Sequence, residues 1–455
     1  MNPFFVYMRV TMKSLVSVIG LGYVGLSTAV CLASRGIKTI GVEKDPNKLK
    51  AISSGHVPFH EERLPQMLNS TMKKGTFECT NQIHKAVEAT RFSFITVGTP
   101  SKPSGEIDTG YVESACVELG EALKRKKVWH AVVVKSTVVS GTTEELIKHT
   151  LEASSSLKAG EDFGLAVNPE FLREGTAVYD TFHPDALVLG CSDRRTLREI
   201  KKLFQKFYRK LPSVIETSTT NAEFIKYSVN TFRAVQLSYL NTLANLSNVL
   251  PDSDVGDVVK GLATIMKLDN RYLRPGPGFG GSCLPKDTRA LAAHMRKKGV
   301  DASVLESALS VNLKQSKVIV DMAEGLTNGL SGKRVAILGL SFKGNTDDVR
   351  ESPSLNIISE LLSRGAVVAA YDPKAMENTR RILGDKVLFS DRAKDCIKGT
   401  HCCIIATDWK EFQTLGPNDF RTSMKTPVVV DARRIFEPES FRNSGVLYRR
   451  LGTSR

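Results

Sequence analysis

A glycine turn between an apolar run and a helical stretch restricts the fold of this chain more than any other feature. Residues 15–19 have the apolar character of a short buried strand. Gly20, Gly22 and Gly25 follow them directly, at the start of a helix-like stretch over residues 23–35. Glycines with this spacing permit a tight turn, close approach of the backbone to a pyrophosphate and close packing of the helix on the strand. The N-terminus of the helix would also attract the phosphate charge. The pattern predicts a strand–turn–helix unit that binds a dinucleotide.

An acidic residue and two later loops extend this predicted site. Glu43 follows the next predicted strand, over residues 38–42, and lies eighteen residues after Gly25. A carboxylate at this place can accept hydrogen bonds from the adenosine ribose and would repel a 2′-phosphate, which favours NAD over NADP. Residues 97–100 and 135–138 end further strands of the same predicted sheet. They are therefore candidates to flank the nicotinamide, with ordinary turns as the alternative.

Alternating strand-like and helical stretches predict the fold class. Apolar strand-like runs separated by helical stretches indicate a parallel, doubly wound sheet in the N-terminal part. Helical periodicity dominates from about residue 221 to residue 322, and a second alternating series begins at residue 334. We therefore expect an α/β protein with two Rossmann-like doubly wound parallel-sheet domains joined by a helical middle domain. The expected limits are 14–212 for the N-terminal NAD-binding domain, 213–325 for the helical middle domain and 326–455 for the C-terminal domain.

Composition narrows the class of protein. The chain of 455 residues is 41% hydrophobic and 24% charged, which suits a globular protein of two or three domains. It has no apolar run of the roughly 20 residues that span a bilayer, and its first residues do not resemble a signal peptide. We therefore expect a cytoplasmic protein. The eight cysteines lack metal-ligand spacing, which indicates reduced thiols and no metal site.

The net charge of +15 has two readings. A solvated basic surface is the simpler one, and attraction of an anionic pyrophosphate substrate is the functional alternative. The basic residues are spread along the chain without interleaved aromatic residues. We therefore expect neither a nucleic acid nor a membrane as partner.

One cysteine lies in a setting that suits chemistry. Residues 278–281 contain three glycines, and Ser282 and Cys283 follow them. Such glycines give a substrate access to the thiol. Lys286 and Asp287 place charge nearby, and a neighbouring cation favours the reactive thiolate. The sequence alone leaves a buried structural cysteine as the alternative.

Two polar pairs have a spacing of four residues. Glu170 and Glu174 would share one face if their segment is helical, and Glu170 could act as a general base. Lys226 and Asn230 would direct a cation and an amide to one point, where they could stabilise an oxyanion. Spacing alone is equally consistent with a solvated helix start for the first pair, and it favours a surface lysine for the second.

The three clusters, in this order after a dinucleotide-binding turn, closely resemble the nucleotide-sugar 6-dehydrogenases. This family includes UDP-glucose dehydrogenase, GDP-mannose dehydrogenase and their UDP-N-acetylhexosamine relatives. The likeness covers about residues 14–440, with further matches at 342–352 and 431–434. It implies an enzyme that uses two NAD to oxidise the C6 alcohol of a nucleotide sugar to a carboxylate, a four-electron oxidation.

The resemblance also implies roles for individual residues. Cys283 would attack the intermediate aldehyde to form a thiohemiacetal, and a second hydride transfer would give a thioester that water hydrolyses. Lys226 and Asn230 would polarise and hold the C6 oxygen. Asp287 and Thr137 would position water. An aldehyde held covalently in this way would not diffuse away between the two oxidations.

The remaining implied roles concern proton transfer and binding. Glu170 would be the acid/base group for aldehyde capture and thioester hydrolysis. The positions assigned to the cofactor are Gly20, Gly22, Tyr23, Val24, Gly25, Glu43, Gly98, Thr99, Lys286 and Arg350. The positions assigned to the nucleotide diphosphate or the sugar are Phe171, Leu172, Glu174, Tyr272, Arg274, Gly280, Lys343 and Arg433. In this family the helical region joins two subunits, so we expect a homodimer or a higher homo-oligomer.

The sequence leaves the sugar nucleotide open. Residues 268–276 form a shorter stretch than their counterpart in UDP-glucose enzymes and, with residues 99–102, resemble the GDP-mannose enzyme. Residues 406–409 instead resemble UDP-glucose enzymes. We favour UDP-glucose, the family's commonest substrate, with GDP-mannose as the alternative, and Ser282 before the reactive cysteine disfavours the N-acetylhexosamines. A non-catalytic nucleotide-sugar-binding protein is the alternative of another class, which the intact set of catalytic residues opposes.

Overall fold

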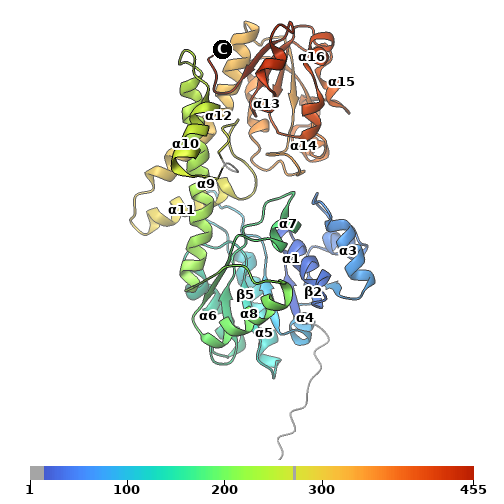
Figure 1. Ribbon diagram of the computed structural model, residues 1–455. Coiled ribbons are helices and arrows are strands. Elements are labelled where there is room, and N and C mark those ends of the chain that lie inside the picture. The colour runs from blue at the N-terminus through green and yellow to red at the C-terminus, as the bar shows by residue number, and fades with distance from the viewer. Residues whose placement is uncertain (1–14, 270–272, 455) are drawn as a thin grey trace, which may run out of the picture. The chain divides into compact units, whose positions relative to one another are not determined.

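The apolar runs recognised in the sequence form two sheets in the computed structural model, which describes residues 15–269 and 273–454 (Figure 1). Each sheet belongs to a unit of its own. The first unit ends at Lys226, and the second begins at Tyr227 and also includes the short segment Pro103–Glu106.

The first sheet has eight strands in the order β3-β2-β1-β4-β5-β6-β7-β8. Neighbouring strands are parallel except β6 and β7, which run antiparallel. Strands β1, β4, β5 and β6 are buried along their whole length because helices cover both faces of the sheet. The strands are β1 (Val16–Ile19), β2 (Thr39–Val42), β3 (Phe77–Thr80), β4 (Phe92–Ile95), β5 (Ala131–Val134), β6 (Gly164–Val167), β7 (Leu187–Cys191) and β8 (Val214–Thr217).

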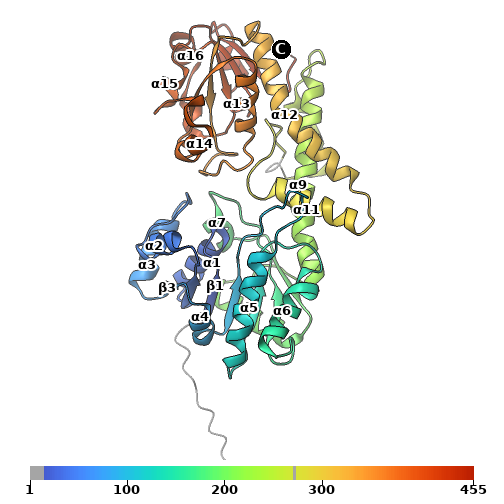
Figure 2. The same ribbon diagram turned by 180° about the vertical axis from the view of Figure 1, so that it is seen from behind.

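The helices of the first unit lie on both faces of this sheet. They are α1 (Tyr23–Ser34), α2 (Pro46–Ser53), α3 (Leu64–Lys73), α4 (Ile83–Ala89), α5 (Gly110–Arg125), the π-helical turn η1 (Thr143–Ile147), α6 (Lys148–Ser155), α7 (Ala177–Phe182) and α8 (Arg194–Phe207). Helices α1, α7 and α8 cover one face (Figure 1), and α4, α5 and α6 cover the other (Figure 2). Parallel crossovers are right-handed, so connections that proceed in opposite directions from β1 place their helices on opposite faces.

The second sheet has six strands, all parallel, in the order β11-β10-β9-β12-β13-β14. Its strands are β9 (Arg334–Leu338), β10 (Val367–Tyr371), β11 (Leu388–Phe389), β12 (Cys402–Ile405), β13 (Val428–Asp431) and β14 (Leu447–Arg450). The helices of this part are α9 (Thr219–Ser247), which begins in the first unit, α10 (Val255–Met266), α11 (Leu284–Lys297), α12 (Ser303–Thr327), α13 (Pro353–Ser363), α14 (Met376–Leu383), α15 (Ala393–Ile397) and α16 (Pro417–Ser423). Short 3-10 turns are η3 (Gly384–Lys386), η4 (Lys410–Thr414) and η5 (Pro438–Phe441).

One apolar core joins the helices of the second unit to its sheet. Leu240 of α9, Val255 of α10 and Ile319 of α12 are buried in the same cluster as Val335 and Ile337 of β9. The helices expected to form a middle domain therefore share their interior with the second sheet. The expected α/β class, with two largely parallel sheets and a helical region between them in the sequence, is confirmed. Within the described ranges, no helix has both the length and the hydropathy that crossing a membrane requires.

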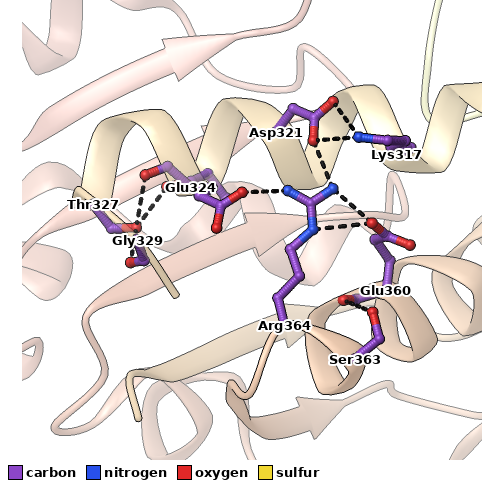
Figure 3. Close-up of polar contacts among 9 residues, drawn as sticks. Lys317, Asp321, Glu324, Thr327, Gly329, Glu360, Ser363 and Arg364 are labelled. Atoms are coloured by element: carbon purple, nitrogen blue, oxygen red, sulfur yellow. Dashed lines mark hydrogen bonds and ion pairs between the residues drawn. The ribbon is translucent and has the colours of Figure 1, made fainter. Parts of the chain in front are cut away.

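An ion-pair cluster fixes α12 against α13 in this second unit (Figure 3). The Arg364 guanidinium, just after α13, donates to Asp321 of α12 at 2.6 Å and to Glu360 of α13 at 2.6 and 2.9 Å. It also donates to Glu324 of α12. Lys317, one turn before Asp321, pairs with the same carboxylate at 3.0 Å. The side chain of Arg364 is 15% exposed. A planar guanidinium thus connects carboxylates of two helices from a largely buried position.

We expect Arg364→Met to lower the free energy of unfolding by about 1–2 kcal/mol, because three carboxylates would lose their shared cation. The matched control is Arg381→Met, which removes an exposed pair with Glu377 on α14 and should cost less than about 0.5 kcal/mol. Urea unfolding of both variants measures the difference. If both variants lowered the free energy of unfolding by the same small amount, the Arg364 cluster would contribute no more stability than an exposed ion pair.

Candidate active site

The three glycines of the turn after β1 have three different surroundings. Gly20 has φ +93°, a left-handed conformation that favours glycine, and a Cβ there would lie 3.0 Å from the backbone of Val97. A Cβ on Gly25 would lie 1.8 Å from the carbonyl oxygen of Gly20. A Cβ on Gly22 would meet nothing within 4 Å. The turn therefore fits a dinucleotide, because Gly22 leaves open the space that a pyrophosphate needs at the start of α1.

Glu43, directly after β2, stabilises this turn through hydrogen bonds. Its Oε2 accepts the N–H of Leu21 at 3.0 Å, and its Oε1 accepts the N–H of Asp45 at 3.0 Å. The side chain is buried. Each carboxylate oxygen can accept a second hydrogen bond, so the group can still meet the ribose hydroxyls. The Glu43 carboxylate thus stabilises the glycine turn and also lies at the end of β2, where the adenosine ribose of a dinucleotide is expected to bind.

The hydroxyl of Tyr23 connects α1 to two other segments. It donates to the buried Glu61 and accepts the N–H of Gly175, while the other oxygen of Glu61 accepts the N–H of Val178 at 3.2 Å. The expected cofactor contacts of Tyr23 and Val24 are therefore left to their backbone N–H groups, which have no acceptor within the first turn of a helix. Glu61 was not recognised from the sequence, because nothing near it signals a contact with α1.

Two loops meet at the carboxyl edge of the first sheet. The hydroxyl of Thr99, after β4, donates to the backbone carbonyl of Thr137, after β5, at 2.9 Å. Ser136 donates to the carbonyl of Val97 at 2.7 Å. Gly98 lies between them with open space where a Cβ would stand. The structure thus brings together the loops that the sequence analysis named as candidates beside the nicotinamide.

Lys226 and Glu170 form a buried ion pair. The Lys226 ammonium donates to Glu170 Oε1 at 2.9 Å and to the Glu170 carbonyl at 2.6 Å. It also lies 5.4 Å from the ring centroid of Phe171. The other carboxylate oxygen accepts the N–H of Leu172 at 2.6 Å. Burial alone would raise the pKa of Glu170, but the Lys226 charge and these hydrogen bonds hold it below its usual value.

The segment of Glu170 is a loop rather than a helix. Residues 168–173 have no regular secondary structure and are followed by a turn at Glu174. The helical relation considered for Glu170 and Glu174 therefore does not apply, and Glu174 is only part-buried. Asn168, after β6, sets the direction of this loop by accepting from Lys135 at 2.9 Å. Lys135 is a further charged group that the sequence analysis did not single out.

Cys283 differs from the other cysteines in its exposure. All eight are free thiols, and Cys283 is exposed while the others are buried or part-buried. Burial raises the pKa to about 12 for Cys31, Cys116, Cys191, Cys396 and Cys402. Cys283 caps the N-terminus of α11, and its sulfur lies 3.5 Å from the Ser282 hydroxyl. The exposed thiol at a helix N-terminus is the one available for chemistry.

The glycines before Cys283 are required by packing. A Cβ on Gly280 would lie 2.3 Å from the carbonyl oxygen of Glu351, and one on Gly281 would lie 2.8 Å from the ring of Phe342. Asn312 of α12 accepts from the N–H of Phe279 at 2.7 Å and donates to its carbonyl at 2.9 Å. The loop that carries Cys283 is thus pressed against residues 342–351 and fixed from α12.

Asp287 lies one turn after Cys283 on α11 and is buried. Its Oδ2 accepts the amide of Asn230 at 2.6 Å, and its Oδ1 accepts the Lys286 ammonium at 2.6 Å. Lys226 and Asn230 stand one turn apart on α9, as the sequence spacing requires. The amide of Asn230 and the ammonium of Lys286, expected at the substrate and the cofactor, both pair with Asp287.

Basic side chains gather at the carboxyl edge of the second sheet. Arg433, after β13, donates to the carbonyl oxygens of Ala406 at 2.8 Å and Phe342 at 2.7 Å. Burial would raise the pKa of Asp408, but Arg433, the N–H of Gly344 and Arg274 together hold it below its usual value. Carboxyl edges of parallel strands are where such folds bind ligands. Arginines here suit an anionic nucleotide diphosphate.

Two of the remaining expected site residues, Lys343 and Arg350, belong to the segment that packs against the Cys283 loop. The ammonium of Lys343 lies 5.8 Å from the ring centroid of Phe342. The exposed Arg350 pairs with Asp348 at 2.6 Å, and its carbonyl accepts the N–H of Gly281 at 2.9 Å. Tyr272 lies outside the described residues. In the parts of the chain that the structure describes, no group of acidic, histidine and cysteine side chains could hold a metal ion.

Comparison with known proteins gives one family for the whole chain. Residues 14–208 match the NAD binding domain of the UDP-glucose/GDP-mannose dehydrogenase family, residues 220–314 its central domain and residues 336–438 its UDP binding domain. UDP-glucose 6-dehydrogenase TuaD of Bacillus subtilis is 35% identical over 96% of this chain and 93% of its own.

Two solved structures are similar over most of their length. A UDP-glucose dehydrogenase from Pyrobaculum islandicum has 34% identity and a TM-score of 0.89, covering 98% of this chain and 99% of its own. A GDP-mannose dehydrogenase from Pseudomonas aeruginosa has 33% identity and a TM-score of 0.54, covering 92% and 97%. The nearly complete coverage of both chains means that the likeness extends over every part of the fold described above.

Proposed function

This chain belongs to the UDP-glucose/GDP-mannose dehydrogenase family, and on that premise we propose that it oxidises UDP-glucose to UDP-glucuronate. It is an NAD-dependent nucleotide-sugar 6-dehydrogenase. The observation that carries the proposed chemistry is the exposed thiol of Cys283, fixed behind packed glycines and one turn before the buried Asp287. Curated relatives that bear the name UDP-glucose 6-dehydrogenase support the choice of sugar nucleotide.

The reaction proceeds in two oxidations with a covalent intermediate. The alcohol at C6 loses a hydride and a proton and becomes an aldehyde. The sulfur of Cys283 adds to the aldehyde carbon, while the carbonyl oxygen takes up a proton. Loss of a second hydride, together with the hydroxyl proton, leaves a thioester, and water cleaves it to the carboxylate and the free thiol with release of a proton. NAD, when bound, accepts each of the two hydrides.

The polar residues move protons and hold oxygen atoms in this reaction. Lys226 and Asn230 donate to the C6 oxygen, where negative charge develops. Glu170 acts as the acid/base group for aldehyde capture and thioester hydrolysis, and its lowered pKa means that it starts as the ionised carboxylate, which can accept a proton. Asp287 and Thr137 position the water that attacks the thioester. Lys226 must share its ammonium between Glu170 and the substrate, since it donates to Glu170 in the free protein.

The nucleotide sugar and the cofactor bind through the residues matched in the sequence. The diphosphate and the sugar meet Phe171, Leu172, Glu174, Tyr272, Arg274, Gly280, Lys343 and Arg433. The cofactor meets Gly20, Gly22, Tyr23, Val24, Gly25, Glu43, Gly98, Thr99, Lys286 and Arg350. The part-buried Arg433 at the edge of the second sheet, with Arg274 near Asp408, supports binding of an anionic diphosphate.

The chain acts as a homodimer formed through its helical part. Phe232, Tyr239 and Leu246 on α9 are 67%, 54% and 51% exposed, and Ile265 on α10 is 84% exposed. Large apolar side chains gathered on neighbouring helices support a surface that a second subunit covers. The functional domains are 14–212, 213–325 and 326–455, in line with the three segments matched by the family. The eight cysteines, none of which forms a disulfide, support a reducing, cytoplasmic location.

The substrate is tested by measuring NADH production with UDP-glucose, GDP-mannose and the UDP-N-acetylhexosamines side by side. We expect turnover with UDP-glucose and two NADH for each molecule of acid. Turnover with GDP-mannose alone would replace the substrate and leave the thioester mechanism standing. Binding of nucleotide sugars without any NADH formation, with a fully folded protein, would instead indicate a non-catalytic binding protein.

A further inference from the structure

A third charged side chain, Lys135, lies beside the Lys226–Glu170 pair and has no part in the reaction described above. Lys135 directly follows β5, and Asn168 directly follows the neighbouring parallel strand β6. The two strands therefore end side by side. The Lys135 ammonium donates to Asn168 Oδ1 at 2.9 Å and to the Asn168 carbonyl at 3.3 Å. A part-buried lysine is thus aimed at the base of the loop that carries Glu170.

The acceptor that holds Lys135 is rigid. Asn168 is 1% exposed, and its amide donates to the carbonyl of Val188 on β7 at 2.9 Å. Its backbone N–H donates to the carbonyl of Val134 at 2.8 Å. The position of the Lys135 ammonium is therefore set by the sheet itself. Lys226 contacts the Glu170 carboxylate from α9, and Lys135 holds the same loop at Asn168, two residues before Glu170.

The groups around Glu170 include two basic side chains, Lys135 and Lys226. Lys135 and Lys226 are two ammonium groups, and Glu170 is the carboxylate that both interact with. Burial lowers the pKa of Lys135 to about 8, with Glu170 opposing and Lys226 adding to that effect. Lys135 therefore interacts favourably with Glu170 when it carries its proton.

Other charged groups near Glu170 have partners of their own. On its own loop, Arg173 pairs with Asp180 at 2.6 Å. On α9, Glu223 lies one turn before Lys226 and accepts the N–H groups of Gly141 at 2.7 Å and Thr143 at 2.8 Å. Besides burial, Lys226 has the largest influence on the pKa of Glu170, and Lys135 is the second cation that lowers it.

We propose that Lys135 is a positioning residue for this reaction, which keeps Glu170 ionised and in place while Lys226 donates to the C6 oxygen of the substrate. The proposal rests on the proposed function, because that function draws the Lys226 ammonium towards the substrate. When Lys226 also donates to the substrate, the buried Glu170 carboxylate needs a second nearby cation to stay ionised. Lys135 provides this charge from a place fixed by Asn168 and acts through Glu170.

The experiment follows the ionisation of Glu170 directly. The ¹³C resonance of its side-chain carboxyl, assigned with Glu170→Gln, is titrated in the wild type, in Lys135→Met and in Lys135→Gln. Loss of a neighbouring positive charge favours the protonated acid, so we expect the pKa of Glu170 to rise by about one unit in both variants. Lys135→Arg keeps the charge and should restore the wild-type titration. With UDP-glucose, the acid limb of the kcat/KM profile should move in the same direction.

Lys126 provides the matched control. Its pKa is also lowered to about 8, mainly by burial, but its ammonium donates to backbone carbonyls, among them that of Thr90 at 2.6 Å. Lys126→Met should lower stability and leave the titration of Glu170 unchanged. Lys135→Gln keeps a donor for Asn168, so it separates loss of charge from loss of a hydrogen bond.

Two results bear on the proposal and on the function separately. An unchanged titration of Glu170 in folded Lys135→Met and Lys135→Gln would overturn the proposal, even if their activity fell. Absence of turnover by the wild type with every nucleotide sugar would contradict the proposed function, while the titration would still decide whether Lys135 keeps Glu170 ionised.

Discussion

Replacing Cys283 with alanine is expected to reduce acid formation at least about 10³-fold, because the variant lacks the sulfur that holds the aldehyde between the two oxidations. Cys283 is the exposed thiol among eight, and it begins α11 where its loop is fixed by contacts with residues 342–351. The variant should keep its fold and its affinity for NAD, because the dinucleotide turn belongs to the first unit. Acid formed from UDP-glucose is measured by mass spectrometry, together with NADH absorbance.

The control for this variant is Cys79→Ala. Cys79 is part-buried in the first unit, and its sulfur lies 3.3 Å from the Ser53 hydroxyl on α2, whereas Cys283 belongs to the second unit. Acid formation by this control should stay within about twofold of the wild type, as for a substitution that touches no reacting group. If Cys283→Ala made acid at the wild-type rate, the covalent mechanism would be wrong.

Gly25→Ala is expected to reduce NAD affinity at least about 100-fold and to lower the free energy of unfolding by about 2–3 kcal/mol. The added Cβ would lie 1.8 Å from the carbonyl oxygen of Gly20 and 2.7 Å from the Thr96 hydroxyl. The carbonyl is backbone, so α1 must move away from β1, and the turn that receives the pyrophosphate would open. Calorimetric titration with NAD and urea unfolding measure the two effects.

Gly22→Ala separates binding from stability at the same turn. Its Cβ meets nothing within 4 Å in the free protein, so stability should change by less than about 0.5 kcal/mol. NAD affinity should nevertheless fall, because the methyl group occupies the space reserved for the pyrophosphate. Equal losses of stability in both variants would refute this division of roles between the glycines.

The glycine turn and the doubly wound parallel fold class were predictable because they depend on local sequence patterns. Gly20 needs a left-handed backbone, Gly25 needs space that a side chain would fill, and Glu43 comes at a fixed distance after them. The second sheet repeats the order of the first six strands of the first sheet, although no residue-level repeat is visible in the sequence. Asp372 takes the place of Glu43 there, after β10, and accepts the N–H of Leu340 at 2.8 Å. The two sheets share a strand order without sharing residues, because the order depends on how helices and strands pack, and many apolar residues can fill the same packing positions.

Contacts between distant segments were not predictable. Lys135 and Asn168 meet because β5 and β6 are neighbours, and no spacing along the chain indicates that. Glu61 reaches the Tyr23 hydroxyl in the same way, from a segment with no signal of its own. The four-residue spacing of Glu170 and Glu174 suggested a helix face, but their segment is a loop shaped by buried polar contacts. Such contacts depend on the whole fold rather than on periodicity.

The apolar core shared by α9, α10 and α12 with β9 has a consequence for dissection of the gene. Leu240 and Ile319 pack in one cluster with Val335, so a cut between Thr327 and Arg334 would leave apolar surface exposed on both fragments. Such pieces would be expected to aggregate on expression, while a fragment that keeps these helices with the second sheet would retain its interior. Fusion points and tags are therefore best placed outside the helical part, and recombination between relatives would preserve folding most often if that block were exchanged whole.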